Sequence, residues 1–295
     1  MVRQSSRKTH RNRRILVTGG SGYLGRHLVP LARGDDEVFY TFFNHDPLGT
    51  PAGIHLDLRD RQAVHELVQS VQPDAVIHTA GSEGSNDSAN VIRSGAKHIT
   101  EAMRMTGGRL VHLSTDVIFD GRSAPYDESR SPSPLHAYGR SKAAAESTVE
   151  SYENHVIVRT SLIYGLDIMD RGTKRMVETL RAGEPYTLFS DQRRNPGWVE
   201  TLSRACLELA SLEYVGVLNV AGGQVLSRAE FGPRLLNWWH VTERTNLTVG
   251  PSDGKKWPRD LELDLRCARG LLTTPLLGAD EVLAEAKRQR RRFDI

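Results

Sequence analysis

The chain has 295 residues, 38% hydrophobic and 25% charged, which is the composition of a folded protein with a sizeable core. Its net charge is only +3, and lysine and arginine crowd the two ends, so the body between them is acidic and nucleic-acid binding is not expected. Cys206 and Cys267 lack the spacing of a metal site or a disulfide framework, and no apolar run could span a membrane. Residues 1–13 are basic and polar, without a signal peptide's apolar stretch, and we expect a disordered tail there. These features predict a cytoplasmic protein with no metal and no membrane partner.

The first structured element is predicted from the stretch RILVTGGSGYLG at residues 14–25. A short apolar run breaks into a glycine turn, and an amphipathic run at residues 23–32 follows, so the order is strand, turn and helix. Gly19, Gly22 and Gly25 have GxxGxxG spacing. The first two would let the backbone lie against a pyrophosphate at the helix N-terminus, and Gly25 would let the helix pack on the sheet. The alternative is a loop that merely needs positive φ at its glycines.

Residues 37–43 (EVFYTFF) predict a second buried strand, and the residues after it bear on the choice of cofactor. A site specific for NAD usually places Asp or Glu at the end of this strand, where the carboxylate binds the ribose hydroxyls. Here Asn44 and His45 stand there instead. The missing carboxylate removes repulsion against a 2′-phosphate and so favours NADP over NAD. His45 or Arg59 could contact that phosphate.

Two further segments are expected to line the cofactor. The segment HLDLRD at residues 55–60 predicts a strand end and the start of a helix over residues 61–71. Asp57 could accept a hydrogen bond from the adenine amino group, or it could cap the helix, a role for which Asp60 competes. Residues 75–81 (AVIHTAG) predict a strand whose small final residues suit close approach by a cofactor at the crevice of an open sheet. The residues expected to make that approach are Thr79, Ala80 and Gly81.

A helix over residues 90–105 and strands at residues 109–113 and 156–159 continue the alternation. Alternating strands and helices without an internal repeat predict a Rossmann-type, doubly wound parallel sheet, closed by residues 156–159 as its sixth strand. We assign residues 14–165 to this dinucleotide-binding core. Residues 166–295 are assigned mainly to a smaller substrate-binding part, intertwined with the core. There we expect helices near residues 172–182, 199–212, 228–239 and 280–291, a short strand at residues 216–220 and a loop at residues 251–258.

A tyrosine and a lysine carry the chemistry. Tyr138 and Lys142 lie four residues apart in a segment of good helix formers, so their side chains share one helix face. An ammonium beside the phenol lowers the phenol's pKa from about 10 and suits it to exchange a proton with a substrate oxygen near neutral pH. Lys142 could also hold the nicotinamide ribose, and the Thr115 hydroxyl could polarise the same carbonyl. The alternative is a surface tyrosine and a solvated lysine, which the order of the motifs disfavours.

Together these motifs resemble the extended short-chain dehydrogenase/reductase family, and within it the dTDP-4-dehydrorhamnose reductase branch. The resemblance runs through VTGGSGYLG, HTAG, STDVIFDG, YGRSK, VRTSLIYG, DQRRNPGWVETL, LNVAGGQVLSRAEFG and WPRDLELD. It implies a catalytic set of Thr115, Tyr138 and Lys142, and a homodimer formed through helices including the one that carries Tyr138. It also implies that Asn90 matches a helix asparagine common in the superfamily. The cofactor contacts that it implies are Gly19, Gly22, Tyr23, Leu24, Asp57, Leu58, Ala80 and Lys142.

The residues after Thr115 separate the sub-reactions of that family. Dehydratases acting on sugar nucleotides follow the threonine with an Asp-Glu pair that eliminates water, whereas here Asp116 precedes Val117. The missing second carboxylate favours NAD(P)H-dependent reduction of a keto group on a dTDP-type, nucleotide-activated deoxysugar. Two alternatives stay open. One is a sugar-nucleotide epimerase that retains NAD. The other is a non-catalytic, NADP-binding regulatory subunit, because catalytic residues can persist in a protein that no longer performs the reaction.

The substrate side departs from the reductases that the chain resembles. Leu162 stands where they commonly carry an aromatic residue, Trp257 stands where arginine often precedes Pro258, and SEGSNDSAN lacks their acidic, threonine-bearing segment. The alternative for the basic residues named below is a solvated loop, and the alternative for Trp198 and Trp257 is ordinary packing. Arg159 is expected to be a buried, paired structural residue. The substrate candidates are Asp116, Arg194, Trp198 and Lys256, with Arg193, Lys255 and Arg259 adding cationic lining for a diphosphate.

Overall fold

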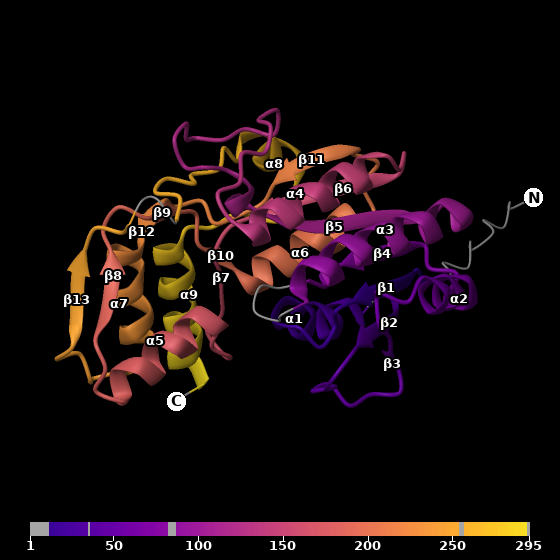
Figure 1. The fold of residues 1–295 in the computed structure, drawn as a ribbon. Coiled ribbons are helices and arrows are strands. Elements are labelled where there is room, and N and C mark those ends of the chain that lie inside the picture. The colour runs from indigo at the N-terminus through magenta and orange to yellow at the C-terminus, as the bar shows by residue number, and fades with distance from the viewer. Residues whose placement is uncertain (1–11, 35, 82–86, 254–256, 294–295) are drawn as a thin grey trace, which may run out of the picture.

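The computed structural model describes residues 12–34, 36–81, 87–253 and 257–293, with side chains described up to residue 290. Helices and strands alternate through the first half of the chain (Figure 1). The helices are α1 Tyr23–Ala32, α2 Arg61–Val71, α3 Ser88–Thr106, α4 Ala137–Glu150, α5 Arg171–Arg181, α6 Val199–Leu209, α7 Arg228–Trp238, α8 Arg266–Leu271 and α9 Ala279–Phe293. The strands are β1 Arg14–Thr18, β2 Glu37–Phe42, β3 Gly53–His55, β4 Ala75–His78, β5 Arg109–Thr115, β6 His155–Thr160, β7 Ile163–Tyr164, β8 Tyr186–Phe189, β9 Arg193–Arg194, β10 Gly197–Trp198, β11 Gly216–Asn219, β12 Leu226–Ser227 and β13 Leu247–Gly250.

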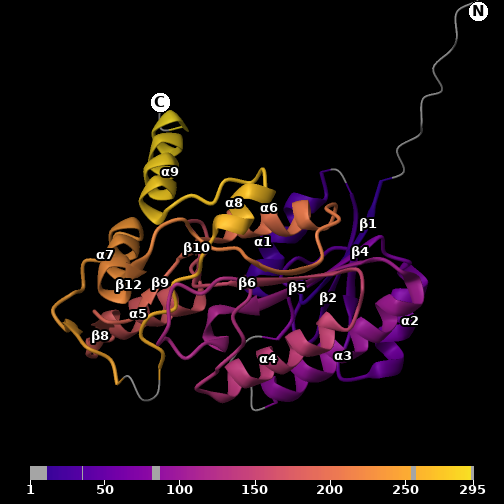
Figure 2. The ribbon, with the colours of Figure 1, turned by 90° about the horizontal axis from the view of Figure 1, so that it is seen from above.

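A parallel sheet in the order β11-β6-β5-β4-β1-β2-β3 forms the centre of the molecule. Helices α1 and α6 cover one face, and α2, α3 and α4 cover the other (Figure 2). The strand order reverses between β1 and β4, and a crevice forms outside the carboxyl ends of the strands at such a reversal. The predicted doubly wound Rossmann-type sheet is therefore confirmed.

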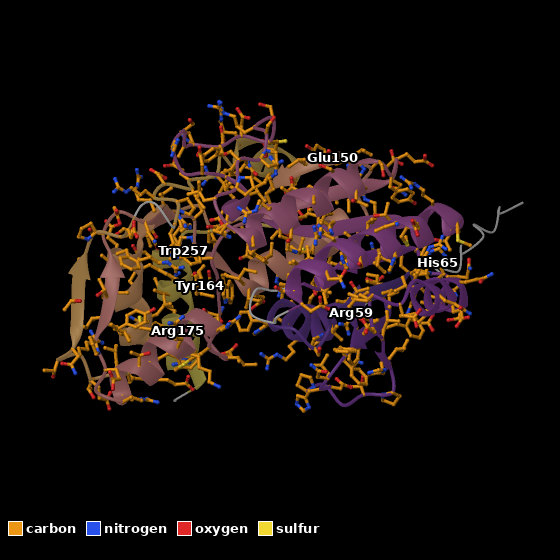
Figure 3. The ribbon with its side chains drawn as sticks, in the orientation of Figure 1. Arg59, His65, Glu150, Tyr164, Arg175 and Trp257 are labelled. Atoms are coloured by element: carbon orange, nitrogen blue, oxygen red, sulfur yellow. The ribbon has the colours of Figure 1, made fainter. Side chains whose placement is uncertain are left out.

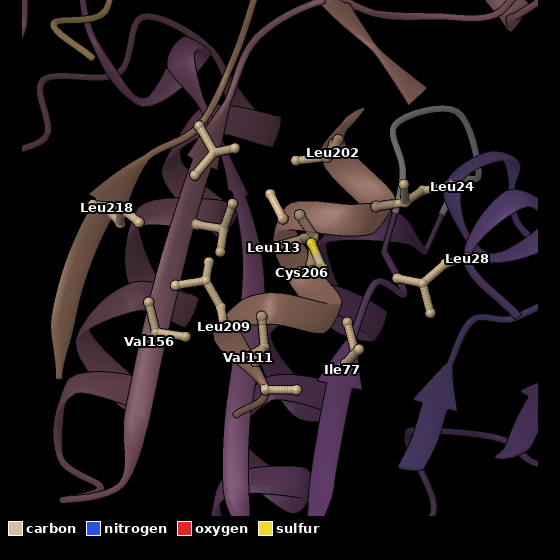
Figure 4. Close-up of a cluster of buried hydrophobic side chains, with 14 of the residues drawn as sticks. Leu24, Leu28, Ile77, Val111, Leu113, Val156, Leu202, Cys206, Leu209 and Leu218 are labelled. Carbon is tan, nitrogen blue, oxygen red and sulfur yellow. The ribbon is translucent and has the colours of Figure 1, made fainter. Parts of the chain in front are cut away.

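The core on the α1/α6 side is a continuous apolar layer between these helices and the sheet (Figure 4). Helix α6 presents Leu202, Cys206 and Leu209 to the sheet, each at most 2% exposed. Burying one such leucine contributes about 1.5–3 kcal/mol, so α6 is held to the sheet chiefly by its apolar face. The residues that it meets include Ile77, Val111, Leu113, Val156 and Leu218 of the sheet and Leu24 and Leu28 of α1.

The C-terminal part has an apolar cluster of its own, to which α5, α7 and α9 contribute on one side of the β8–β13 pair (Figure 1). Tyr164, Phe231 and Trp238 fill its centre, with the rings of Tyr164 and Phe231 5.2 Å apart. Trp198 packs against both this cluster and the α1/α6 core. The cluster therefore adjoins the central core at Trp198.

Two expectations about the sheet are wrong. The sixth strand, β6, does not close it, because β11 pairs with β6 in parallel and forms the edge. The pairing is between segments far apart in sequence, so no local pattern could reveal it. The strand expected at residues 75–81 ends at His78, since the next residues leave the sheet to meet the glycine turn. No helix within the described ranges combines the length and apolar character needed to cross a bilayer.

Candidate active site

The glycine turn between β1 and α1 lies against the end of β4. Gly19 has a φ of +75°, and a Cβ there would lie 2.8 Å from the Cα of Ala80, so the conformation and the contact both require glycine. The Thr79 hydroxyl donates to the carbonyl oxygen of Thr18 at 2.9 Å and joins the two strand ends. The structure thus brings together Gly19, Thr79 and Ala80, three of the predicted cofactor residues.

Helix α1 begins with its backbone N–H groups available to a ligand. Gly22 is the N-cap, no described side chain caps the helix there, and its first turn holds no acidic residue. Gly25 packs so closely on the turn that a Cβ would lie 2.5 Å from the carbonyl oxygen of Gly19. Unpaired N–H groups and the positive end of the helix dipole suit a pyrophosphate. The residues present therefore fit a dinucleotide cofactor.

The side chains of Tyr23 and Leu24 have partners elsewhere. The Tyr23 hydroxyl donates to the carbonyl oxygen of Ile168 at 2.8 Å, and burial raises its pKa well above the usual value. The Leu24 side chain is buried in the α1/α6 core. Their predicted cofactor contacts would have to come from the backbone N–H groups of the first helical turn.

Asn44 and His45 both lie exposed just beyond the end of β2. Beside them the ring of Phe43, 45% exposed, stacks on His55 with centroids 5.8 Å apart. The Arg59 guanidinium lies 5.4 Å from the centroid of the Phe43 ring. An aromatic surface therefore borders the place expected for the adenosine half of the cofactor, while Arg59 is ion-paired with Asp57 and Asp87.

Asp60, and not Asp57, caps α2, because its carboxylate accepts from the backbone N–H of Ala63 at 3.1 Å. Asp57 instead forms an ion pair of 2.6 Å with Arg59, whose hydrogen bond lowers the pKa of the carboxyl. This leaves the adenine role of Asp57 as a prediction. Leu58 is buried, and its carbonyl oxygen lies 2.9 Å from Nδ1 of His98.

Two other predicted residues lie near the start of α3. Gly81 has a φ of +96°, and a Cβ there would lie 2.6 Å from Cγ1 of Ile92. Only glycine can make that turn without strain. Asn90 is exposed in the first turns of α3, where its side-chain oxygen accepts from the Ser94 hydroxyl at 2.9 Å.

The first turn of α4, which carries Tyr138, lies directly on the turn that follows β5, the strand that ends at Thr115. A Cβ on Gly139 would lie 2.3 Å from the carbonyl oxygen of Val117, so only glycine permits this packing. The ring of His136 caps α4 by accepting from the Gly139 N–H at 3.3 Å. Thr115 is the last residue of β5, and its partly exposed hydroxyl lies 3.4 Å from the Val117 N–H.

Lys142 is buried, at 3% exposure, and its Nζ donates to the carbonyl oxygen of Leu113 at 2.9 Å. The alternative of a solvated lysine is therefore wrong. Burial lowers the pKa of Lys142 to about 8, while the charge of Glu146 opposes that shift. An ammonium held in the interior, one helical turn from Tyr138, suits the stabilisation of a phenolate.

A buried ion pair lies behind Lys142. Arg159 donates to both carboxylate oxygens of Glu146, with the shortest distance 2.8 Å, and their side chains are 3% and 2% exposed. The Ser114 hydroxyl also donates to Glu146. The expectation that Arg159 is a buried, paired residue is confirmed. Sequence reasoning missed Glu146, although its place four residues after Lys142 continues the same helix face.

Two buried histidines, His78 and His112, pair across β4 and β5 with rings stacked 5.2 Å apart. The Thr18 hydroxyl lies 2.5 Å from Nδ1 of His78. Burial lowers the pKa of His78 to about 3 and that of His112 well below its usual value, and the nearby charge of Lys142 acts in the same direction. Both rings are therefore neutral at physiological pH.

Two predicted substrate residues, Asp116 and Arg194, pair with each other. Their side chains are each 4% exposed, and Nε of Arg194 lies 3.4 Å from Oδ2 of Asp116. The Ser161 hydroxyl donates to the same oxygen at 2.6 Å. Burial raises the pKa of Asp116, against the opposing effects of Arg194 and Ser161. The solvated-loop alternative is therefore wrong for Arg194.

Other members of the predicted cationic lining have carboxylate partners. Arg193 lies 3.0 Å from Asp260, and Arg259 lies 3.2 Å from Asp191. Lys255 and Lys256 lie outside the described residues, and Trp198 is the N-cap of α6. The described residues contain no cluster of His, Cys, Asp and Glu that could hold a metal ion.

Comparison with known proteins places this geometry in a family. The family described as RmlD substrate binding domain matches residues 13–264. A dTDP-4-keto-6-deoxy-D-glucose reductase of Streptomyces niveus is 32% identical over 255 residues, covering 83% of this chain and 82% of that protein. Methionine adenosyltransferase 2 subunit beta of Mus musculus is 24% identical over 271 residues, covering 86% of this chain and 80% of the relative.

Among solved structures, the dTDP-4-dehydrorhamnose reductase of Bacillus anthracis in complex with NADP superposes with a TM-score of 0.75 at 25% identity. The match covers 90% of this chain and 94% of that one. The family match spans the glycine turn, the Tyr138/Lys142 helix and the Arg194 strand. The chain belongs to the RmlD substrate binding domain family, of the extended short-chain dehydrogenase/reductase type.

Proposed function

We propose that the protein is an NAD(P)H-dependent oxidoreductase that reduces a keto group on a nucleotide-activated, dTDP-type deoxysugar. The observation that carries this is the Lys142 ammonium, which is buried and anchored to β5 one helical turn from Tyr138. The Streptomyces relative named as a dTDP-4-keto-6-deoxy-D-glucose reductase supports the choice of substrate class.

In the proposed reaction, a nicotinamide held by the glycine turn and Lys142 would supply the hydride for the carbonyl carbon of the sugar. The electrons of the C=O double bond move to the oxygen, which takes the proton of the Tyr138 hydroxyl. Lys142 stabilises the resulting phenolate, and the Thr115 hydroxyl donates a hydrogen bond to the substrate oxygen. Solvent then returns a proton to Tyr138. Positioned proton transfer of this kind contributes typically about 10²–10⁴-fold in rate.

We propose that the cofactor is NADP rather than NAD. Asn44 and His45, the two residues expected beside the adenosine ribose, lie exposed beyond the end of β2, and neither is a carboxylate. Asn44→Asp should lower kcat/KM with NADPH by at least about tenfold relative to NADH, because it places a negative charge near a 2′-phosphate. Equal effects on the two cofactors would reject this part of the proposal.

The direct test is NADPH oxidation by the purified protein with a dTDP-4-keto-6-deoxy sugar. Steady consumption of NADPH, one molecule per ketone reduced, supports the reductase. An epimerase would retain NAD through purification and interconvert sugars with no net consumption of NADPH. A regulatory subunit would bind NADPH without turnover on any keto sugar nucleotide. Either of these results rejects the reductase.

We also propose that the protein works as a homodimer in the cytoplasm. The resemblance to the extended reductases suggests that α4, which carries Tyr138, contributes to the dimer contact. Sedimentation equilibrium of the full chain tests the assembly, and a monomer at micromolar concentration would rule out a stable dimer.

A further inference from the structure

Trp257 is an aromatic residue that is partly open to solvent, and the His136 ring links it to the ring of the proposed proton donor, Tyr138. The Trp257 side chain is 40% exposed, and its ring lies against His136 with centroids 5.0 Å apart. The His136 ring in turn lies nearly parallel to that of Tyr138, at 6.4 Å and 12°. The three rings form a row that starts on α4 and ends in the segment before β-bridge residue Asp260. Figure 3 shows Trp257 near the junction of the C-terminal part with the sheet core.

The two residues that follow Trp257 are held from the C-terminal part. The Arg194 guanidinium donates to the carbonyl oxygens of Pro258 and Arg259, at 3.4 and 3.5 Å. The Arg193 N–H donates to the same Arg259 oxygen at 2.7 Å. Because Arg194 is itself held by buried Asp116, the residue after Thr115, the segment is tied to the end of β5.

The core fixes the same segment from the other side. Gly121 has a φ of +76°, and a Cβ there would lie 2.7 Å from the N of Arg259 and 2.8 Å from Cβ of Pro258. The loop after β5 therefore packs directly on the residues that follow Trp257. The chain directly after Trp257 is thus held from both sides, which limits the movement of the backbone that a ligand on the indole would have to order.

We propose that the Trp257 indole is a platform for the sugar ring of the substrate. This inference rests on the proposed function. A ketone oxygen hydrogen-bonded to Tyr138 places the hexose ring next to the proton donor, whereas the base lies a diphosphate further away. The C–H face and methyl group of a 6-deoxyhexose are apolar. An indole offers a flat apolar surface with a polar edge, which matches such a ring.

The test compares Trp257→Ala and Trp257→Phe with the wild type, using NADPH and a dTDP-4-keto-6-deoxy sugar. Loss of the platform should raise KM by roughly tenfold with a smaller change in kcat, and phenylalanine should restore most of the loss. Inhibition by dTDP without a sugar should be unchanged. Trp239→Phe, at a partly buried tryptophan after α7, is the matched control and should behave as wild type.

Two results would overturn the platform. An unchanged KM in Trp257→Ala would mean that the indole does not contact substrate, and equal weakening of dTDP and of the sugar nucleotide would mean that it contacts the nucleotide. If the wild type proves inactive, the proposed function is rejected but the platform is not, and binding is then measured by calorimetry. There, Trp257→Ala should abolish the affinity advantage of a dTDP-6-deoxyhexose over dTDP, and an advantage kept intact rejects the platform independently.

Discussion

A hydrogen bond of 2.9 Å joins Nζ of Lys142 to the carbonyl oxygen of Leu113 and crosses from α4 to β5. An ammonium has three N–H donors, and within the described part of the chain this is the acceptor that Lys142 uses. In the proposed reaction, the other two donors would serve the Tyr138 oxygen and a ribose hydroxyl. The bond also prevents the charge from swinging to solvent, so the side chain is in place before a ligand arrives.

Replacing Tyr138 by Phe should lower kcat by about 10²–10⁴-fold, because the reacting oxygen loses its proton donor. The dissociation constant for NADPH should change little, and both quantities can be measured on the purified variant. Tyr152→Phe is a matched control. Tyr152 lies just after α4, and its hydroxyl donates to the carbonyl oxygen of Gly108, away from the proposed reaction. A Tyr138→Phe enzyme that kept most of its turnover would show that another group supplies the proton.

Burial of Lys142 should make part of the stability depend on pH. Its pKa is about 8 in the fold, against 10.5 without burial. Below about pH 8 the native and unfolded chains both hold the proton, and the full cost of burying the ammonium is present. Between these pKa values only the unfolded chain holds it, so the contribution of this group to the free energy of unfolding rises with pH, by up to about 3 kcal/mol.

Urea unfolding of the wild type and of Lys142→Met, at several pH values between about 7 and 10, measures this contribution. The difference between the two proteins should move in favour of the wild type as pH rises. Lys174→Met, at a side chain that is 65% exposed, should show no such trend. A Lys142 difference that stayed constant with pH would contradict a lowered pKa.

Glu146→Gln should destabilise the fold by about 3–5 kcal/mol, since it leaves the buried Arg159 charge without its partner. The double replacement Glu146→Met/Arg159→Met removes both charges and should cost clearly less than the sum of the single replacements. A double-mutant cycle in urea measures the coupling. Strictly additive losses would mean that the two side chains contribute independently.

Gly19→Ala should weaken NADPH binding and lower stability by more than about 1 kcal/mol, because φ is positive and the added Cβ would meet the Ala80 backbone. Gly270→Ala in α8 is the control, because a Cβ at Gly270 would have no atom within 4 Å and the residue is helical. That variant should keep full NADPH affinity and gain about 0.5–1 kcal/mol. If Gly19→Ala bound NADPH as tightly as the wild type, the turn would not be a cofactor cradle.

Local patterns in the sequence predicted much of the fold. The first two helices have the expected bounds, residues 23–32 and 61–71. Each has a clear apolar face, and its start is marked by a residue typical of helix N-termini, Gly22 for α1 and Asp60 for α2. Helix α4 formed as expected and placed Tyr138 and Lys142 on one turn. In each case the determining interactions lie within a few residues of one another.

The rest depended on contacts between distant segments. Asp116 and Arg194 each looked like a substrate ligand in isolation, and only the fold shows that they neutralise each other in the interior. The Glu146–Arg159 pair joins a helix to a neighbouring strand in the same way. The sequence around a charged residue does not indicate whether its partner in the fold is solvent, substrate or another side chain.

The position of β11 at the sheet edge has a consequence for biosynthesis. During translation β6 leaves the ribosome well before β11, so its outer row of N–H and C=O groups must wait for a partner. A strand whose edge is unpaired, and whose residues are all buried in the finished fold, readily pairs with another chain. Nascent chains that stall between the two strands are therefore expected to be aggregation-prone.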